Sequence, residues 1–223
     1  MSEPHAPAYQ AVRTRVSELL QGPGAAAFDR TAPATPEWRV HDVLSHMVGV
    51  TVDVVHGRLD GIATDPWTAA QVDARAGDSL DALLDEWAAY SPRFEEMLAA
   101  VPDEISGQAL LDAATHEHDI RHAIGVPGAR DSDAVAFGWD WLVATRTRAG
   151  RSAIRFVTET DDVVAGAGDP VVTARAGRFE LVRASTGRRS AGEIARYAWD
   201  PAPDPEQLLA APFFRVRAEP LCE

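Results

Sequence analysis

The chain has 223 residues, of which 46% are hydrophobic and 25% charged, a composition typical of a globular protein with a sizeable core. Its formal net charge of −13 argues against nucleic-acid binding, because phosphate contacts require a basic surface. No apolar run reaches the roughly 20 residues that span a bilayer, and the chain does not begin with a secretory signal. We therefore expect a cytoplasmic protein without membrane contact.

Cysteine content and charge distribution limit the kinds of binding site that the chain can form. The single cysteine, Cys222, excludes an internal disulfide framework and a cysteine-based zinc site. Residues 1–130 hold 9 Arg against 20 Asp and Glu, whereas residues 131–223 hold 12 against 14. The acidic excess of the first part suits a cation site there, although a solvated acidic surface would have the same composition.

The first part of the chain predicts a helical bundle. Apolar residues recur at helical spacing in four long segments: about 8–21, 40–60, one that begins near residue 78 and carries apolar residues as far as Leu98, and 107–124. A short helix is expected after Pro66, a kink at Pro92, and a helix end at Gly125. Four amphipathic helices joined by modest loops favour a four-helix bundle.

The sequence pattern changes after Gly125. Five elements are predicted there: a helix at 132–148, β-strands at 153–158 and 171–175, and helical segments around 178–186 and 190–198. A turn-rich stretch at 166–170 should separate the two strands. We expect a mainly α protein, with a helical bundle over residues 1–149 and a small α+β domain over residues 150–223.

All seven histidines lie within the first 122 residues, so histidine chemistry belongs to the bundle. On its helix, His46 lies at the edge of the apolar stripe, and Gly49, one turn later, leaves room for a ligand to approach the backbone. Asp112 and His116, also one turn apart, bring a carboxylate and an imidazole within reach of one ion. Three ligands from two helices, with a vacant fourth position, are typical of a catalytic metal.

The expected roles of the neighbouring polar residues follow from their angular positions around each helix. Asp119 is expected to orient His116 through its other ring nitrogen, and His56 is a candidate for lining the same pocket. Glu117 is expected behind the ligands or in solvent, and His118 and His122 on a solvated face. The alternative for the whole set is that the histidines are capped or satisfied within the core and bind no metal.

Three segments carry a family resemblance. Residues 38–46, WRVHDVLSH, resemble the W-x-V-x-D-V-x-x-H signature of the mycothiol-dependent maleylpyruvate isomerase family, part of the DinB-like metal-binding bundles. Residues 112–125, DAATHEHDIRHAIG, are similar to the family's E-x-x-x-H-x-x-D-[LI]-x-x-A-x-G signature. Residues 179–190, FELVRASTGRRS, resemble the small second domain of actinobacterial relatives.

The resemblance implies a divalent metal, usually zinc, on His46, Asp112 and His116, with mycothiol as the thiol cofactor. Because a metal lowers a thiol's pKa from about 8.5, it would supply a thiolate for isomerisation or S-transfer on a small electrophile. Asp112 departs from the family, which has Glu at this position. Either the helices lie closer together, or the metal binds more weakly, or the site has changed its role.

Other assignments remain open. Arg188 or Arg189, before a predicted capping box at Ser190, is a candidate clamp for a substrate carboxylate or simply part of a solvated basic turn. Trp38 is expected to pack on the helix at 40–60. The rival functions are a non-catalytic metal- or ligand-binding bundle and a structural or regulatory homo-oligomer, and both a monomer and a homodimer remain open.

Overall fold

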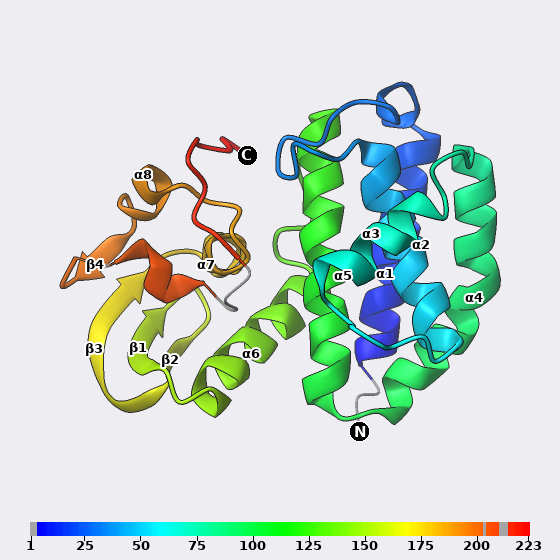
Figure 1. Ribbon diagram of the computed structural model, residues 1–223. Helices are drawn as coiled ribbons and strands as arrows, with labels where there is room; N and C mark the ends of the chain where they lie inside the picture. The colour runs from blue at the N-terminus through cyan, green and yellow to red at the C-terminus, as the bar shows by residue number, and fades with distance from the viewer. Residues whose placement is uncertain (1–3, 203, 210–213) are drawn as a thin grey trace. The chain divides into compact units, whose positions relative to one another are not determined.

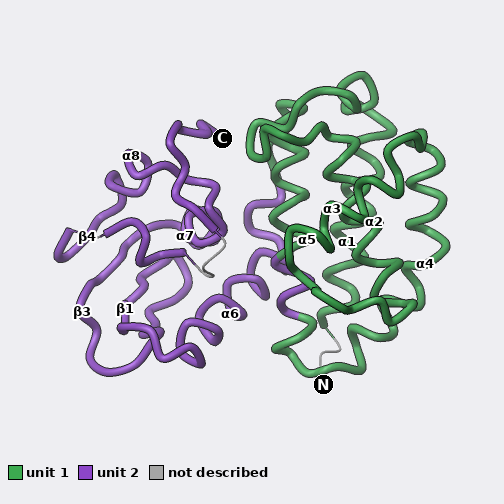
Figure 2. Tube along the Cα trace, viewed as in Figure 1, with its two compact units in different colours: residues 1–106, 112–128 green, residues 107–111, 129–223 purple. Residues whose placement is uncertain are grey.

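The computed structural model describes residues 4–202, 204–209 and 214–223. It divides into two compact units, which Figure 2 draws in green and purple. The first unit holds residues 1–106 and 112–128, and the second holds residues 107–111 and 129–223. Among the described residues, no helix is both long enough and apolar enough to cross a membrane.

The first unit is helical, as expected. It contains α1 (His5–Gln21), the turn η1 (Ala25–Ala27), α2 (Val40–Val55), α3 (Asp65–Asp73), α4 (Leu80–Ala100) and most of α5 (Asp103–Ile124). In Figure 1 the four long helices run alongside one another, and the short α3 lies across α2. Two predicted limits were wrong: α2 ends at residue 55 instead of 60, and α5 begins at residue 103 instead of 107.

The ends of the helices follow from local side-chain chemistry. The Ser79 hydroxyl accepts a hydrogen bond from the Ala82 amide at 3.2 Å and so caps α4. Gly125 ends α5 in the left-handed conformation, with φ at 73°. At α2, the Asp42 carboxylate accepts from the Arg39 backbone amide at 2.8 Å and binds the Arg39 guanidinium. The acidic residue thus satisfies a helix start that lacks a Ser or Thr cap.

A buried hydrogen-bonded cluster ties α1, α2 and α4 together in the first unit. The Trp87 indole donates to the Tyr9 hydroxyl at 2.9 Å, and that hydroxyl lies 2.6 Å from Thr51. Burial raises the pKa of Tyr9 to about 12, so the phenol stays protonated. Because α4 runs as one helix on both sides of Pro92, Trp87 and Phe94 both reach this core.

The second unit is a small sheet with helices, and it confirms the expected α+β class. Its elements are α6 (Asp133–Arg148), β1 (Ser152–Val157), β2 (Asp162–Ala165), β3 (Ala167–Arg175), α7 (Arg178–Ser185), α8 (Ala191–Ile194), β4 (Ala198–Asp200) and η2 (Pro205–Leu208). The strand order among the described residues is β2-β1-β3-β4, with β1 parallel to β3 and the other neighbours antiparallel. Trp139 of α6 packs edge-on against Phe156 of β1, with ring centroids 5.2 Å apart.

Three predictions for the second unit were wrong. β2 and β4 were not expected, because strands of four and three residues carry too short a pattern to detect. Most of the stretch at 166–170, predicted as a turn, instead belongs to β3, which begins at Ala167 opposite Ser152 of β1, whereas Gly166 is a bend between β2 and β3. The helix expected at 190–198 stops at Ile194, since the backbone at Ala198 joins the sheet.

The compact units divide after residue 128, so α6 groups with the sheet. The domain boundary predicted between residues 149 and 150 refers to domains that fold independently, which is a different property from compactness. That boundary stays a prediction.

Candidate metal centre

Two helices of the first unit bring three candidate ligands together. His46 lies on α2, and Asp112 and His116 lie one turn apart on α5. One ligand atom from each residue can be chosen so that all three lie within 4.8 Å of one another. The Asp112 Oδ1 atom lies 3.5 Å from the Nε2 atom of His46 and 3.5 Å from that of His116.

These separations fit a single ion. Two ligands at about 2.1 Å from a tetrahedral ion lie roughly 3.4 Å apart, close to the distance from Asp112 to each imidazole. Two nitrogens and one carboxylate oxygen are also donors that zinc accepts. The imidazoles are buried, with His46 4% exposed, whereas 36% of the Asp112 side chain remains exposed. The group therefore fits a divalent metal with an open side.

The second ring nitrogen of each histidine is already occupied. His46 Nδ1 lies 2.8 Å from the Gln71 side-chain oxygen, and His116 Nδ1 lies 3.1 Å from the Asp119 carboxylate. Because both partners are acceptors, Nδ1 carries the hydrogen in each ring and Nε2 faces Asp112. Asp119 thus lies where the sequence placed it.

Gln71, on α3, was not identified from the sequence. Its amide nitrogen donates to Asp53 at 2.8 Å, which turns the amide oxygen toward His46. Gly49 makes this approach possible, because a Cβ there would lie 2.5 Å from the Gln71 Cβ and 3.1 Å from an Arg75 nitrogen. The room that Gly49 leaves is therefore filled by α3. Gln71 falls outside both motifs, so no sequence signal pointed to it.

Trp38 forms one wall of the site. Its ring lies 5.5 Å from the His46 ring and 6.1 Å from the His116 ring, measured between centroids. Trp38 therefore packs on α2, as expected, but its contact there is with the candidate ligand His46. It also contacts His116 on α5. The motif held the signal for this role, since tryptophan is its first residue. A half-buried indole beside two imidazoles shields them from water.

The electrostatics of the three side chains are coupled. Burial favours the neutral acid at Asp112, but the electrostatic and hydrogen-bond interactions with the neighbouring imidazoles of His46 and His116 outweigh it and hold the Asp112 pKa well below its usual range. Burial also works to lower the His116 pKa, yet Asp112 and Asp119 raise it to about 9. In the absence of a metal, the protonated imidazole of His116 therefore balances part of the negative charge of Asp112.

Several other residues do not lie where the sequence suggested. Glu117 is fully buried and binds the guanidinium groups of Arg15 and Arg121, so of the two positions expected for it, behind the ligands or in solvent, the second was wrong. His118 is buried and His122 half-buried, so the expectation that both lie on a solvated face was wrong.

His56 follows the end of α2 and is exposed, with its ring 5.3 Å from that of Tyr90. In the second unit, Arg189 binds Glu180 and Glu223, so its charge is already neutralised. Arg188 donates to the Thr186 carbonyl at 2.7 Å. Contact of Arg188 with substrate, and of His56 and Gly49 with a cofactor, stay predictions.

Comparisons with known proteins show the family and the fold of the chain. The family model described as the mycothiol maleylpyruvate isomerase N-terminal domain matches residues 9–144, which include all three candidate ligands. No curated protein matches the chain. A crystal structure of the mycothiol-dependent maleylpyruvate isomerase superposes with a TM-score of 0.60 at 14% identity, covering 92% of this chain and 95% of that one. A crystal structure of a point mutant of that isomerase has the same coverage and identity, with a TM-score of 0.59. Because the family model spans more than half of the sequence, the chain belongs to the mycothiol maleylpyruvate isomerase N-terminal domain family.

Proposed function

We propose that this protein is a divalent-metal-dependent enzyme that uses a low-molecular-weight thiol, mycothiol, for isomerisation or S-transfer on a small electrophile. Membership of the family supports the thiol, and the similar fold of an isomerase supports the reaction class. Zinc is the metal that suits the donor set. The proposal includes a cytoplasmic location and neither nucleic-acid nor membrane partners.

One observation carries the proposal: Asp112 lies at the same 3.5 Å from the Nε2 atoms of His46 and His116, at the spacing of ligands around one ion. A divalent ion held there would lower the pKa of a thiol sulfur at its open position and supply thiolate at neutral pH.

The protein's own residues would do the positioning. Gln71 and Asp119 each hold an imidazole by its Nδ1 atom, so neither ring can rotate its Nε2 away without losing a hydrogen bond. Trp38 excludes water from one side of both rings. Asp112, being partly exposed, leaves the approach for thiol and electrophile on its own side.

The first test is the metal content of the purified protein. We expect about one zinc per chain by elemental analysis, and a loss of that metal in His46→Ala and in Asp112→Asn, which keeps the shape of the side chain and removes its charge. His56→Ala is the matched control, because this exposed histidine lies outside the three-residue group. Wild-type protein without stoichiometric metal after incubation with zinc would refute the metal site.

The second test separates an enzyme from a binding protein. Metal-loaded protein should consume an electrophile such as a conjugated cis-dienoic acid only when mycothiol is present, and His116→Ala should abolish this turnover. The rival, a non-catalytic metal-binding bundle, predicts one metal per chain and a thermal shift with mycothiol but no turnover. This rival should be tested directly, because position 112 has Asp where the family has Glu, and the shorter side chain is compatible with a site that has changed its role.

A further inference from the structure

Arg146 differs from the other buried arginines in the described part of the chain. Five arginines are buried there, and four of them bind a carboxylate. The pairs are Arg75 with Glu86, Arg121 with Glu117, Arg183 with Glu223, and Arg189 with Glu180 and Glu223. Arg146 is 8% exposed and forms no ion pair with any described carboxylate. An uncompensated buried charge is costly, so some other group should balance it.

The backbone satisfies only part of the Arg146 side chain. One terminal nitrogen donates to the Gln207 carbonyl at 2.6 Å and the other to the Ser152 carbonyl at 2.7 Å. The Nε atom is buried and has no hydrogen-bond partner.

A second cation lies beside Arg146. Arg151 donates to the same Gln207 carbonyl at 3.4 Å and also to the Leu209 carbonyl. Burial and then the charge of Arg151 lower the Arg146 pKa to about 10, which still leaves Arg146 charged at neutral pH. Two cations therefore share one carbonyl oxygen, which carries only a partial negative charge.

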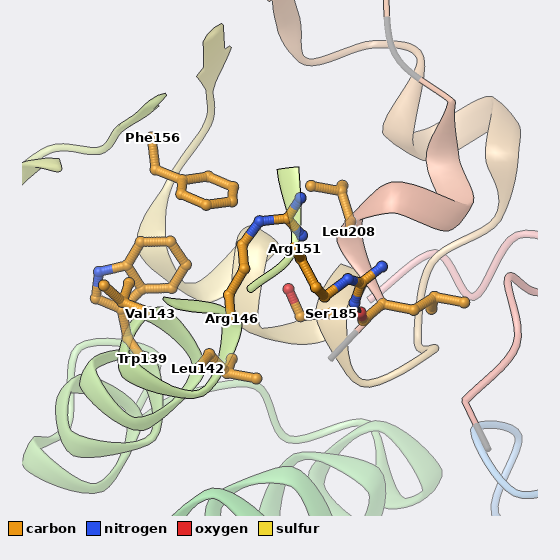
Figure 3. A pocket seen from close by; sticks show the side chains of 9 residues that line it. Trp139, Leu142, Val143, Arg146, Arg151, Phe156, Ser185 and Leu208 are labelled. Carbon is orange, nitrogen blue, oxygen red and sulfur yellow. Dashed lines mark hydrogen bonds between the residues drawn. The ribbon is translucent and has the colours of Figure 1, made fainter. Parts of the chain in front are cut away.

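Both arginines line a small cavity of the second unit, drawn in Figure 3. Its volume is about 20 Å³, slightly more than the roughly 10–15 Å³ that one water molecule needs. Ser185 also lines the cavity, and its hydroxyl adds a polar group to the lining. The remaining lining is mostly apolar: Trp139, Leu142, Val143, Phe156, Leu208 and Leu209.

We propose that this cavity binds a halide-sized inorganic anion, held by the guanidinium groups of Arg146 and Arg151 and by the Ser185 hydroxyl. A monatomic anion matches the volume, whereas a carboxylic acid with an apolar body does not fit. The mostly apolar lining lowers the local polarity and so strengthens the attraction of a bound anion to the two cations. The bound anion would help to fix the segment around Gln207 against α6 and β1, because both arginines hold that segment by its carbonyls.

The test uses chloride on the full-length protein. The ³⁵Cl NMR line should broaden in proportion to protein at constant ionic strength, with gluconate as the balancing anion, and bromide should reverse the broadening saturably. The broadening should be lost in Arg146→Met and reduced in Arg151→Met. It should persist in Arg155→Met, the matched control, because Arg155 on β1 is exposed and paired with Asp162.

A further variant distinguishes this site from the proposed metal centre, since a protein-bound zinc ion also broadens the chloride line. The bromide-sensitive broadening should remain in His116→Ala, whatever becomes of the metal. Broadening lost in His116→Ala but kept in Arg146→Met would overturn the proposal. The absence of bromide-sensitive broadening in the wild-type protein would also overturn the proposal, because it would mean that the cavity holds water alone. This result does not depend on whether Arg146→Met folds.

Discussion

At the scale of single residues, the Asp112–His116 pair makes the stability of the metal-free protein depend on pH. The pKa of His116 is about 9 in the fold and near 6.5 in an unfolded chain, so the folded state binds more protons between these values. The stabilisation is fully present below pH 6.5 and is lost as pH rises through 9. Urea unfolding in the presence of a chelator should show a loss of at most about 3 kcal/mol over this range.

The His116→Gln variant is the control for this pH dependence, because it removes the titrating group and should flatten the profile. Stability that stayed constant or rose in the wild type between pH 6.5 and 9 would show that the imidazole and the carboxylate are not paired.

Gln71 is expected to act on the metal through His46. Gln71→Leu keeps the size of the side chain but removes the acceptor for the His46 Nδ1 hydrogen, so the ring is free to rotate or to change tautomer. We expect metal affinity to fall by about 10- to 100-fold. Gln108→Leu, on the exposed face of α5, should leave it unchanged.

Competition with a chelating dye measures this metal affinity. ¹⁵N NMR of the His46 ring reports the tautomer, which a purely structural role of Gln71 would not alter. An unchanged tautomer with unchanged affinity in Gln71→Leu would remove Gln71 from the site.

At the scale of elements, the contact between α2 and α3 depends on Gly49. In an isolated helix, Gly49→Ala would be favourable by about 1 kcal/mol. Here the added Cβ would lie 2.5 Å from the Gln71 Cβ, and relieving such a clash costs about 1–3 kcal/mol. We expect a net loss of stability in thermal unfolding together with weaker metal binding, because Gln71 is displaced from His46.

Gly77→Ala is the matched control for this contact, since nothing lies within 4 Å of the Cβ it would add. A Gly49→Ala protein as stable as the wild type would mean that α3 does not pack on α2 as the structure has it.

At the scale of the whole molecule, the second unit depends on ion pairs between distant parts of the chain. Glu223 accepts from both Arg183 and Arg189, three side chains that are almost fully buried. Glu223→Gln removes the negative charge and leaves two buried cations short of a partner. We expect a loss of about 3–5 kcal/mol in denaturant unfolding. Glu219→Gln, at an exposed position, should change stability by less than about 0.5 kcal/mol.

Local patterns in the sequence were enough for the helices and for the candidate ligands. Apolar residues at helical spacing gave the four long helices, since each turn of a helix is a local structure. The spacing of Asp112 and His116 placed both on one face of α5 for the same reason. The position of His46 at the edge of the apolar stripe of its helix made it the third candidate, and the resemblance to a family supported grouping it with the other two.

Only the tertiary structure decided which groups surround these residues. Gln71 lies 25 positions from His46, and their contact depends on the packing of α3 against α2, which no local pattern encodes. The burial of His118 and Glu117 likewise could not be predicted from the weak apolar pattern of α5 itself. β2 and β4 exist because neighbouring strands supply their hydrogen bonds, and strands of three or four residues have no preference strong enough to form alone.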